Sequence, residues 1–337
     1  MADPVASASQ PRHGGDLAFA TAFYGIPSGG WLDLSTGINP TPYPAAQITA
    51  DQLGRLPDGV ALGRLLAAAR AAYGVPAGVR LVATPGTELA IRLVPLVAPA
   101  GSVAVVGPTY GSHEDTWRNA GRPVHVVGDL TEVPVEATIL VVGNPNNPDG
   151  RTFAPSQLAD LARGLAGRGG LLVVDEAFAD VAPDVSLVGT LADLPAIVLR
   201  SFGKFHGLAG LRLGFVAGSP PIVAGLAAIL GDWSVSSPAL TVGAAALSDD
   251  AWRAAARKSL SRQNRELRAV LIRHRLAIRG GTDLFVLIED EDATGVHSRL
   301  AERGIWTRAF ANQPRWLRIG LPGSRLDRLD RALSDCR

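Results

Sequence analysis

Short runs rich in valine, isoleucine and leucine recur through the middle of the chain, and a helix-like segment follows each of them. Two of these runs, residues 138–143 and 171–174, are apolar at nearly every position, which is typical of parallel strands buried on both faces. The strand-then-helix pattern extends from about residue 81 to residue 218 and predicts a mostly parallel α/β sheet. A chain of 337 residues can bury the core of such a domain and of a second, smaller one.

These patterns predict three parts of the chain. Residues 46–232 should form the large domain, and residues 233–337 a small C-terminal domain with strands near residues 284–288 and 316–321. Residues 1–45 should form an N-terminal arm that joins the small domain and contributes to the active site.

Lysine is rare in this chain, and one of the two lysines lies in a distinctive motif. Lys204 and Lys258 are the only lysines among 32 basic residues. Because lysine can lose its proton and form an imine whereas arginine cannot, Lys204 is the candidate nucleophile. Ser201 precedes it by three residues and Arg212 follows it by eight, a spacing suited to a phosphate group that accepts hydrogen bonds from a hydroxyl and an arginine fork. The alternative is a solvated loop lysine near a structural arginine.

Other polar residues end or follow predicted strands. Asp175 ends the second apolar run, and a carboxylate at the C-terminal end of a strand is well placed for chemistry. Asn147 lies in an Asn- and Pro-rich turn after the run 138–143, and residues 86–88 resemble a glycine turn that opens a helix able to bind an anion. Each turn is common by itself, and Tyr110, which follows another apolar run, is equally well explained as a core tyrosine.

In this order along the chain, the segments resemble the motifs of the class I/II aminotransferase superfamily, the fold-type I enzymes that use pyridoxal 5′-phosphate (PLP). The resemblance covers about residues 33–321 and implies a large domain with a mostly parallel sheet, a smaller α+β domain and a homodimer. It implies that Lys204 and Asp175 are catalytic, with Asp175 paired to the pyridine nitrogen. The cofactor-binding residues that it implies are Gly86, Thr87, Glu88, Tyr110, Asn147, Asp175, Ser201, Lys204 and Arg212.

The N-terminal segment narrows this resemblance. His13-Gly-Gly-Asp-Leu17, followed by the aromatic and Gly-containing segment 31–44, resembles the cobalamin-biosynthesis branch of threonine-phosphate decarboxylases. A histidine next to two glycines can meet a substrate phosphate, and its charge responds near neutral pH; the alternative is a solvated terminal histidine. The resemblance implies that Arg318 binds the substrate's α-carboxylate. The implied substrate-binding residues are His13, Ser35, Gly37, Asn39, Asn147 and Arg318.

The reaction implied by the resemblance is PLP-dependent decarboxylation of L-threonine O-3-phosphate to (R)-1-amino-2-propanol phosphate in cobalamin biosynthesis. A histidinol-phosphate-like aminotransferase is the alternative, because the sequence does not show which bond at the α-carbon is held for cleavage. Phe178 favours the decarboxylase, since many aminotransferases carry there a tyrosine that donates a hydrogen bond to the cofactor, and phenylalanine cannot. Leu56 also departs from the pattern, because related enzymes often have there a tyrosine that reaches the cofactor phosphate of the neighbouring subunit.

Composition bears on the partners and the location. A net charge of +1 gives no support for a nucleic-acid partner, and the basic stretch 253–279 has the pattern of one long amphipathic helix, whose charged face is more simply explained by solvent than by a membrane surface or an acidic partner. The single cysteine, Cys336, allows neither an internal disulfide nor zinc-ligand spacing. No apolar stretch has the length of a transmembrane helix, and residues 1–11 lack the features of a signal peptide. We therefore predict a cytoplasmic enzyme without a metal, and the intact Lys204 disfavours a binding or regulatory protein that keeps the fold without catalysis.

Overall fold

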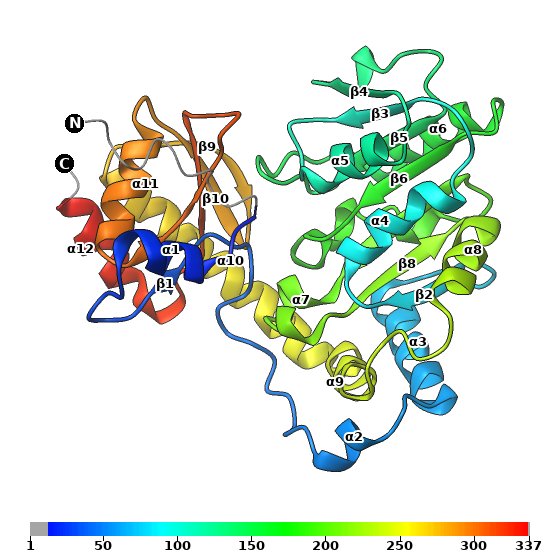
Figure 1. The fold of residues 1–337 in the computed structure, drawn as a ribbon, viewed down its shortest axis with the longest axis horizontal. Helices are drawn as coiled ribbons and strands as arrows, with labels where there is room; N and C mark the ends of the chain where they lie inside the picture. The colour runs from blue at the N-terminus through cyan, green and yellow to red at the C-terminus, as the bar shows by residue number, and fades with distance from the viewer. Residues whose placement is uncertain (1–12, 336–337) are drawn as a thin grey trace. The chain divides into compact units, whose positions relative to one another are not determined.

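The computed structural model describes residues 13–335, and the chain divides into two compact units (Figure 1). The larger unit is Thr41–Lys258, and the smaller one combines Met1–Pro40 with Ser259–Arg337. These boundaries differ from the expected ones near residues 45 and 232, because helix α9 (Ser237–Ser248) packs against α3 (Gly59–Tyr73) within the larger unit. Residues 1–12 of the expected arm and Cys336 lie outside the described part of the chain.

A seven-stranded sheet forms the centre of the larger unit, in the order β2-β8-β7-β6-β5-β3-β4. Strand β8 runs antiparallel to both of its neighbours, and the remaining strand pairs are parallel. The strands are β2 (Arg80–Thr84), β3 (Val103–Val106), β4 (Val124–Val127), β5 (Ile139–Gly143), β6 (Leu171–Asp175), β7 (Ala196–Ser201) and β8 (Gly214–Gly218). The predicted α/β class is thereby confirmed, and the two apolar runs form β5 and β6 in the middle of the sheet.

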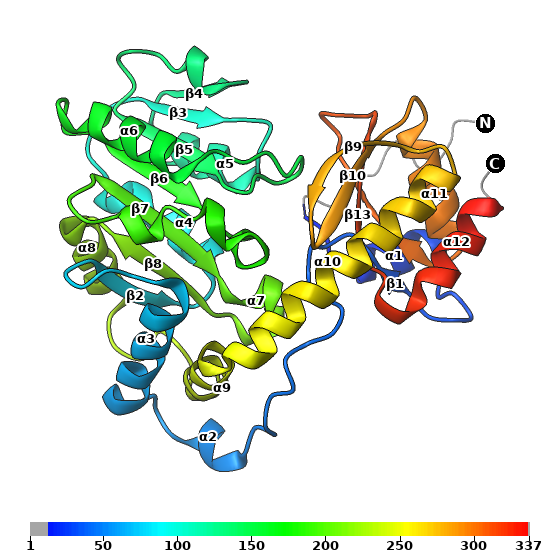
Figure 2. The ribbon, with the colours of Figure 1, turned by 180° about the vertical axis from the view of Figure 1, so that it is seen from behind.

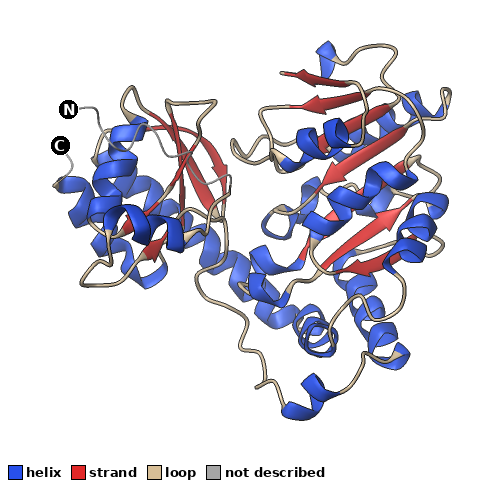
Figure 3. Cartoon of the chain, in the orientation of Figure 1, coloured by secondary structure: helices blue, strands red, loops and turns tan. Residues whose placement is uncertain are grey.

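Helices cover both faces of this sheet (Figures 1–3). Alternate residues of β5 and β6 point into two separate hydrophobic clusters, as the two-residue period of a strand requires. Helix α6 (Pro155–Ala166) contributes to one cluster, whereas α4 (Thr87–Val97), α5 (Ser112–Asn119) and α8 (Pro220–Leu230) contribute to the other. The short helices α2 (Ala50–Gly54) and α7 (Phe202–Phe205) complete the unit together with α3 and α9.

The smaller unit contains a four-stranded antiparallel sheet in the order β12-β13-β10-β9. Its strands are β9 (Ala277–Thr282), β10 (Phe285–Glu289), β12 (Arg308–Ala309) and β13 (Trp316–Gly320), and β1 (Leu32–Asp33) pairs in parallel with β11 (Ile305–Trp306). Its helices are α1 (Leu17–Tyr24), α11 (Ala293–Glu302) and α12 (Leu326–Ser334). Strands β10 and β13 correspond to the two strands expected from the sequence.

The long basic helix is shorter than expected. Helix α10 (Asp250–Arg273) ends where Arg275 adopts a left-handed backbone conformation with φ of 55°, and the rest of the stretch 253–279 enters strand β9. The prediction of one helix to residue 279 was wrong because arginine and alanine occur on both sides of this turn. Within residues 13–335, no helix is long and apolar enough to cross a membrane.

Candidate active site

Most of the predicted cofactor-binding segments meet at one edge of the large sheet. Strands β2, β5, β6 and β7 end at this edge, and antiparallel β8 begins there, because Gly214 is in register with both Thr84 and Ser201. Gly143 and Asp175 are likewise in register at the ends of β5 and β6. The loops that follow these strands therefore emerge side by side, in the position where α/β sheets bind ligands.

The turn before α4 lies directly against the arginine of the lysine motif. Gly86 has a φ of 82°, and a Cβ built on it would lie 2.8 Å from Nη2 of Arg212. A Cβ on Gly214 would lie 2.8 Å from the backbone N of Thr87. Glycine at these two positions thus lets the arginine approach the first N–H groups of α4. Such a combination of helix N-terminus and guanidinium suits a phosphate group.

Arg212 is itself held in an unusual backbone conformation. Its φ of 52° is left-handed, and its Nη1 donates a hydrogen bond to the backbone O of Ala209 at 3.0 Å. Across the same edge, Ser201 precedes helix α7 and is half-buried. The structure therefore brings the predicted phosphate-binding residues Gly86, Thr87, Ser201 and Arg212 to one sheet edge.

Asp175 is held by a histidine that the sequence analysis missed. Nε2 of His113 lies 2.9 Å from Oδ2 of Asp175, and the backbone N of Ala177 donates to Oδ1 at 3.1 Å. Both the histidine and the carboxylate are buried. Two fixed partners orient the carboxylate, and a buried carboxylate of this kind can pair with a protonated pyridine nitrogen. No feature of the sequence marks this histidine, because its partner Asp175 lies 62 residues away.

Glu88 supports Tyr110 through a direct hydrogen bond. The Tyr110 hydroxyl donates to Oε2 of Glu88 at 3.0 Å, and the Ser112 hydroxyl donates to Oε1 at 3.1 Å. Arg92 forms an ion pair with the same carboxylate at 2.7 Å. Burial raises the pKa of Tyr110, the hydrogen bond from Ser112 opposes this, and the Glu88 charge raises it further. The phenol therefore stays protonated, and its ring is fixed at the sheet edge.

The turn that carries Asn147 is braced by its neighbours. The Asn144 amide donates to the backbone O of Phe153 at 3.2 Å and of Val185 at 2.8 Å. The Asn146 amide donates to the backbone O of Pro108 at 2.9 Å. These two side-chain amides are buried, whereas Asn147, the predicted cofactor ligand, is only partly buried.

Lys204 lies on the single-turn helix α7. A Cβ on Gly203 would come within 2.6 Å of Cα of Ala209, so this helix packs directly against the turn that leads to Arg212. Nζ of Lys204 lies 6.0 Å from the centre of the Phe178 ring, which is buried and offers no hydrogen-bond donor. Lys258, by contrast, is exposed on α10, and Leu56 is exposed after α2.

In the smaller unit, Ser35 connects the N-terminal arm to the predicted carboxylate ligand. The Ser35 hydroxyl accepts a hydrogen bond from the backbone N of Gly15 at 2.7 Å and donates to Asp33 at 2.6 Å. Its backbone O accepts from Nη2 of Arg318 at 2.7 Å. A Cβ on Gly14 would collide with that same backbone O. The glycine next to His13 is thus required for the arm to lie against Ser35.

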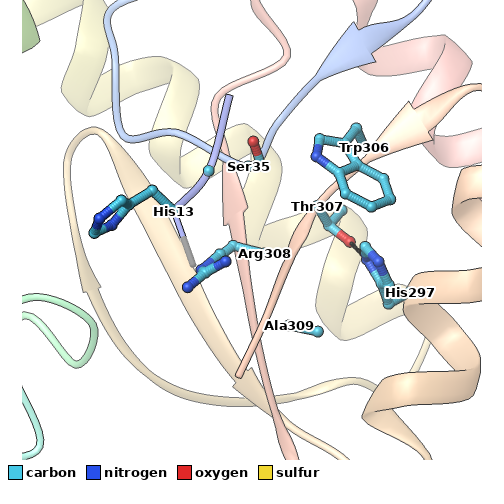
Figure 4. A pocket seen from close by; sticks show the side chains of 8 residues that line it. His13, Ser35, His297, Trp306, Thr307, Arg308 and Ala309 are labelled. Atoms are coloured by element: carbon cyan, nitrogen blue, oxygen red, sulfur yellow. Dashed lines mark hydrogen bonds between the residues drawn. The ribbon is translucent and has the colours of Figure 1, made fainter. Parts of the chain in front are cut away.

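A pocket in this unit brings His13 and Ser35 together with a second arginine that the sequence analysis missed (Figure 4). Arg308 on β12 is directly opposite Arg318 on β13, so their side chains leave the same face of the sheet. Two guanidinium groups on one face of the sheet suit a ligand that carries anionic groups. The pocket is lined by His13, Gly14, Ser35, His297, Trp306, Thr307, Arg308 and Ala309. Gly37 and Asn39 are buried further along the arm, outside this lining.

The wall of the pocket contains a buried, neutral histidine. Nδ1 of His297 lies 2.7 Å from the Thr307 hydroxyl, and its ring packs on Trp306 with centroids 4.6 Å apart. Burial, together with the nearby Arg308, lowers the pKa of His297 to about 4. The positive charges at the pocket are therefore those of Arg308 and, when protonated, His13.

The family model of aminotransferase class I and II matches residues 64–335. The threonine-phosphate decarboxylase of Sinorhizobium sp. is 43% identical over 92% of this chain and 92% of its own length, and that of Pseudomonas aeruginosa is 41% identical over 96% and 97%. The histidinol-phosphate aminotransferase of a Geobacter species is 28% identical over 87% of each chain. Among solved structures, histidinol-phosphate aminotransferase from Sinorhizobium meliloti in complex with PLP has a TM-score of 0.83 at 22% identity, covering 100% of this chain and 97% of its own.

Proposed function

Because this chain belongs to the aminotransferase class I and II family, we propose that it is a PLP-dependent decarboxylase in cobalamin biosynthesis, which converts L-threonine O-3-phosphate to (R)-1-amino-2-propanol phosphate. The observation that carries the proposal is its similarity, at 43% and 41% identity over nearly the whole chain, to two threonine-phosphate decarboxylases. The alternative, a histidinol-phosphate-like aminotransferase, has weaker support, at 28% identity to the Geobacter aminotransferase.

The residues at the sheet edge fit PLP by size and by chemistry. Glycine at positions 86 and 214 leaves room for a phosphate beside Arg212 and Thr87, and Ser201 completes this end. When bound, PLP supplies an electron sink for the pair left on the substrate's α-carbon. Asp175, oriented by His113, would hold the proton on the pyridine nitrogen.

The remaining residues at this edge would orient the cofactor and supply a proton to the substrate. Tyr110, with its hydroxyl fixed by Glu88, and Asn147 would hold the cofactor ring. Lys204 is the residue that would hold the cofactor, and its Nζ would supply the proton that the α-carbon takes up after carbon dioxide leaves. Phe178 supports decarboxylation, because a buried phenylalanine supplies no second donor to the 3′-oxygen.

The substrate carries two anionic groups, and the smaller unit offers cationic groups suited to each. Arg318 binds the α-carboxylate, with Nη2 steadied by the backbone of Ser35. His13 and Arg308, both at the pocket, bind the phosphate. Gly37 and Asn39 shape the buried arm that carries these contacts.

We also propose that the enzyme is a cytoplasmic homodimer. The segment from residue 48, through α2, to the first turn of α3 exposes several large apolar side chains, which is typical of a surface covered by a partner. Ile48, Leu53, Leu56 and Val60 are between 44% and 71% exposed. A second copy of the chain is the proposed partner, and sedimentation of the purified protein would test this.

The decisive experiment is to incubate the PLP-loaded protein with L-threonine O-3-phosphate in the absence of a keto acid. We expect carbon dioxide and the amino-alcohol phosphate in equal amounts. Lys204→Ala should abolish both products, whereas Lys258→Ala, which removes the other, exposed lysine, should leave them unchanged. Turnover of histidinol phosphate with a keto acid, and none of the threonine ester, would assign the aminotransferase instead.

A further inference from the structure

His206, two residues after Lys204, is fully buried and has no role in the reaction described above. Its Nδ1 lies 3.0 Å from the backbone O of Phe202, so Nδ1 carries the proton and donates it to this carbonyl. The backbone N of His206 donates to the same carbonyl at 3.4 Å, so the side-chain bond reinforces the closure of the single turn of α7 across the lysine. A four-residue helix has little stability of its own and depends on such tertiary and side-chain contacts.

Aromatic rings clamp the imidazole from both sides. The Phe202 ring stacks on His206 with centroids 4.1 Å apart and planes at 10°, and Trp252 stacks on it at 5.6 Å and 13°. The backbone O of His206 also accepts a hydrogen bond from the backbone N of Tyr43 at 2.9 Å. The residue after the lysine helix is thus fastened to α10 and to the segment that leads into α2.

The imidazole is held in its neutral form. Burial lowers the pKa of His206, Asp180 opposes this, and Arg253 and Arg200 lower it further. Its Nε2 is buried and has no hydrogen-bond partner within residues 13–335. A phenylalanine would fill the same space between the two rings without leaving a buried nitrogen unsatisfied. What the histidine adds is the N–H donated to Phe202.

We propose that His206 is a positioning residue for Lys204, which fixes helix α7 through its hydrogen bond to Phe202 and so presents the amine to the cofactor. The inference rests on the proposed function only in that Lys204 is the residue that binds PLP. His206 does not touch the substrate, and its effect is transmitted through the backbone of α7.

Two substitutions separate the hydrogen bond from the packing. His206→Phe keeps a stacking ring and loses the donor, whereas His206→Asn places an amide N–H close to where Nδ1 stands and loses the stacking. We expect His206→Phe to keep the melting temperature of the apo protein, to lower kcat by about 10- to 100-fold with KM nearly unchanged, and to shift the pH titration of the bound-cofactor absorption. His206→Asn should melt at a lower temperature but retain the wild-type titration.

Tyr73→Phe serves as the matched control, because Tyr73 lies over Arg200 in the same buried region and belongs to helix α3. It should leave kcat and the cofactor titration unchanged. A purely structural role of His206 predicts the opposite pattern, with His206→Phe active and normal in its titration and His206→Asn impaired in both, and would overturn the inference.

The failure of the proposed function would look different. If Lys204→Ala retained the cofactor absorption of the wild-type protein, Lys204 would not be the residue that binds PLP, and the assignment on which the inference rests would fall. If Lys204→Ala lost that absorption while His206→Phe matched the wild type, only the inference would fail.

Discussion

Gly214 in strand β8 should be important for cofactor affinity, because it lies directly against Gly86 and Thr87 of the proposed phosphate-binding turn. In Gly214→Ala the new Cβ would lie 2.8 Å from the backbone N of Thr87 and 3.0 Å from the backbone C of Gly86. Ordinary contacts of a Cβ begin near 3.4 Å, so the turn at residues 86–88 must move away from residue 214 by about 0.6 Å. Both atoms are backbone and cannot move aside by a change of rotamer.

This movement displaces the N–H groups of the proposed phosphate-binding turn. Losing one charge-assisted hydrogen bond costs about 1.5–3 kcal/mol, so the dissociation constant for PLP should rise about 10- to 100-fold. Overpacking should also destabilise the apo protein by about 1–3 kcal/mol. Spectroscopic titration of apo protein with PLP measures the first quantity, and urea unfolding of the apo protein measures the second.

Gly164→Ala is the control for this experiment. Gly164 is exposed in α6, and nothing lies within 4 Å of its added Cβ, so the change should stabilise the protein by about 0.5–1 kcal/mol and leave PLP affinity alone. Wild-type PLP affinity in a folded Gly214→Ala protein would refute the assignment of the 86–88 turn to the phosphate.

Three further changes test other parts of the site. His113→Phe removes the hydrogen bond to Asp175 and should lower kcat by about tenfold or more, since bonds to charged groups contribute about 1.5–3 kcal/mol; unchanged steady-state kinetics would contradict the role given to His113. Arg308→Met should raise KM for L-threonine O-3-phosphate by about 10- to 100-fold. The melting temperature of the apo protein should stay the same or rise, because the substitution removes one charge of a like-charge pair on facing strands. A lower apo melting temperature with an unchanged KM would contradict both expectations. Burial lowers the pKa of His297 from 6.5 to about 4 in the folded protein, so the unfolded chain takes up the proton first as the pH falls. The free energy of unfolding is therefore unaffected by this group above about pH 6.5, and it decreases by about 3 kcal/mol between there and pH 4. In His297→Phe, the free energy of unfolding measured with urea should fall less steeply over this pH range than in the wild type. Parallel pH profiles of the two proteins would contradict the lowered pKa of His297.

The sheet could be predicted from the sequence because its strands are continuous apolar runs that end in polar residues, and parallel strands bring such ends to one edge. His113 could not be assigned in this way, because its partner Asp175 lies on a strand 62 residues away. Arg308 could not be identified from the sequence for a related reason. Its relation to Arg318 depends on the antiparallel register of β12 and β13, and arginine is too frequent in this chain to mark a site by itself.

The end of helix α10 shows a different limit. The stretch 253–279 keeps a similar mixture of arginine and apolar residues throughout, yet the chain turns at Arg275 and pairs with β10 as strand β9. Tertiary pairing decided between helix and strand there, and composition alone carried no signal of it.

The facing arginines on β12 and β13 also bear on how the product leaves. In the proposed function, the phosphate and the carboxylate of the substrate would bind to Arg308 and Arg318, which face each other across the strand pair. Loss of carbon dioxide would remove one of those anions, so the product would make fewer charge-assisted contacts than the substrate. The proposed reaction would therefore weaken the binding of its own product, and the charges on strands β12 and β13 would favour product release.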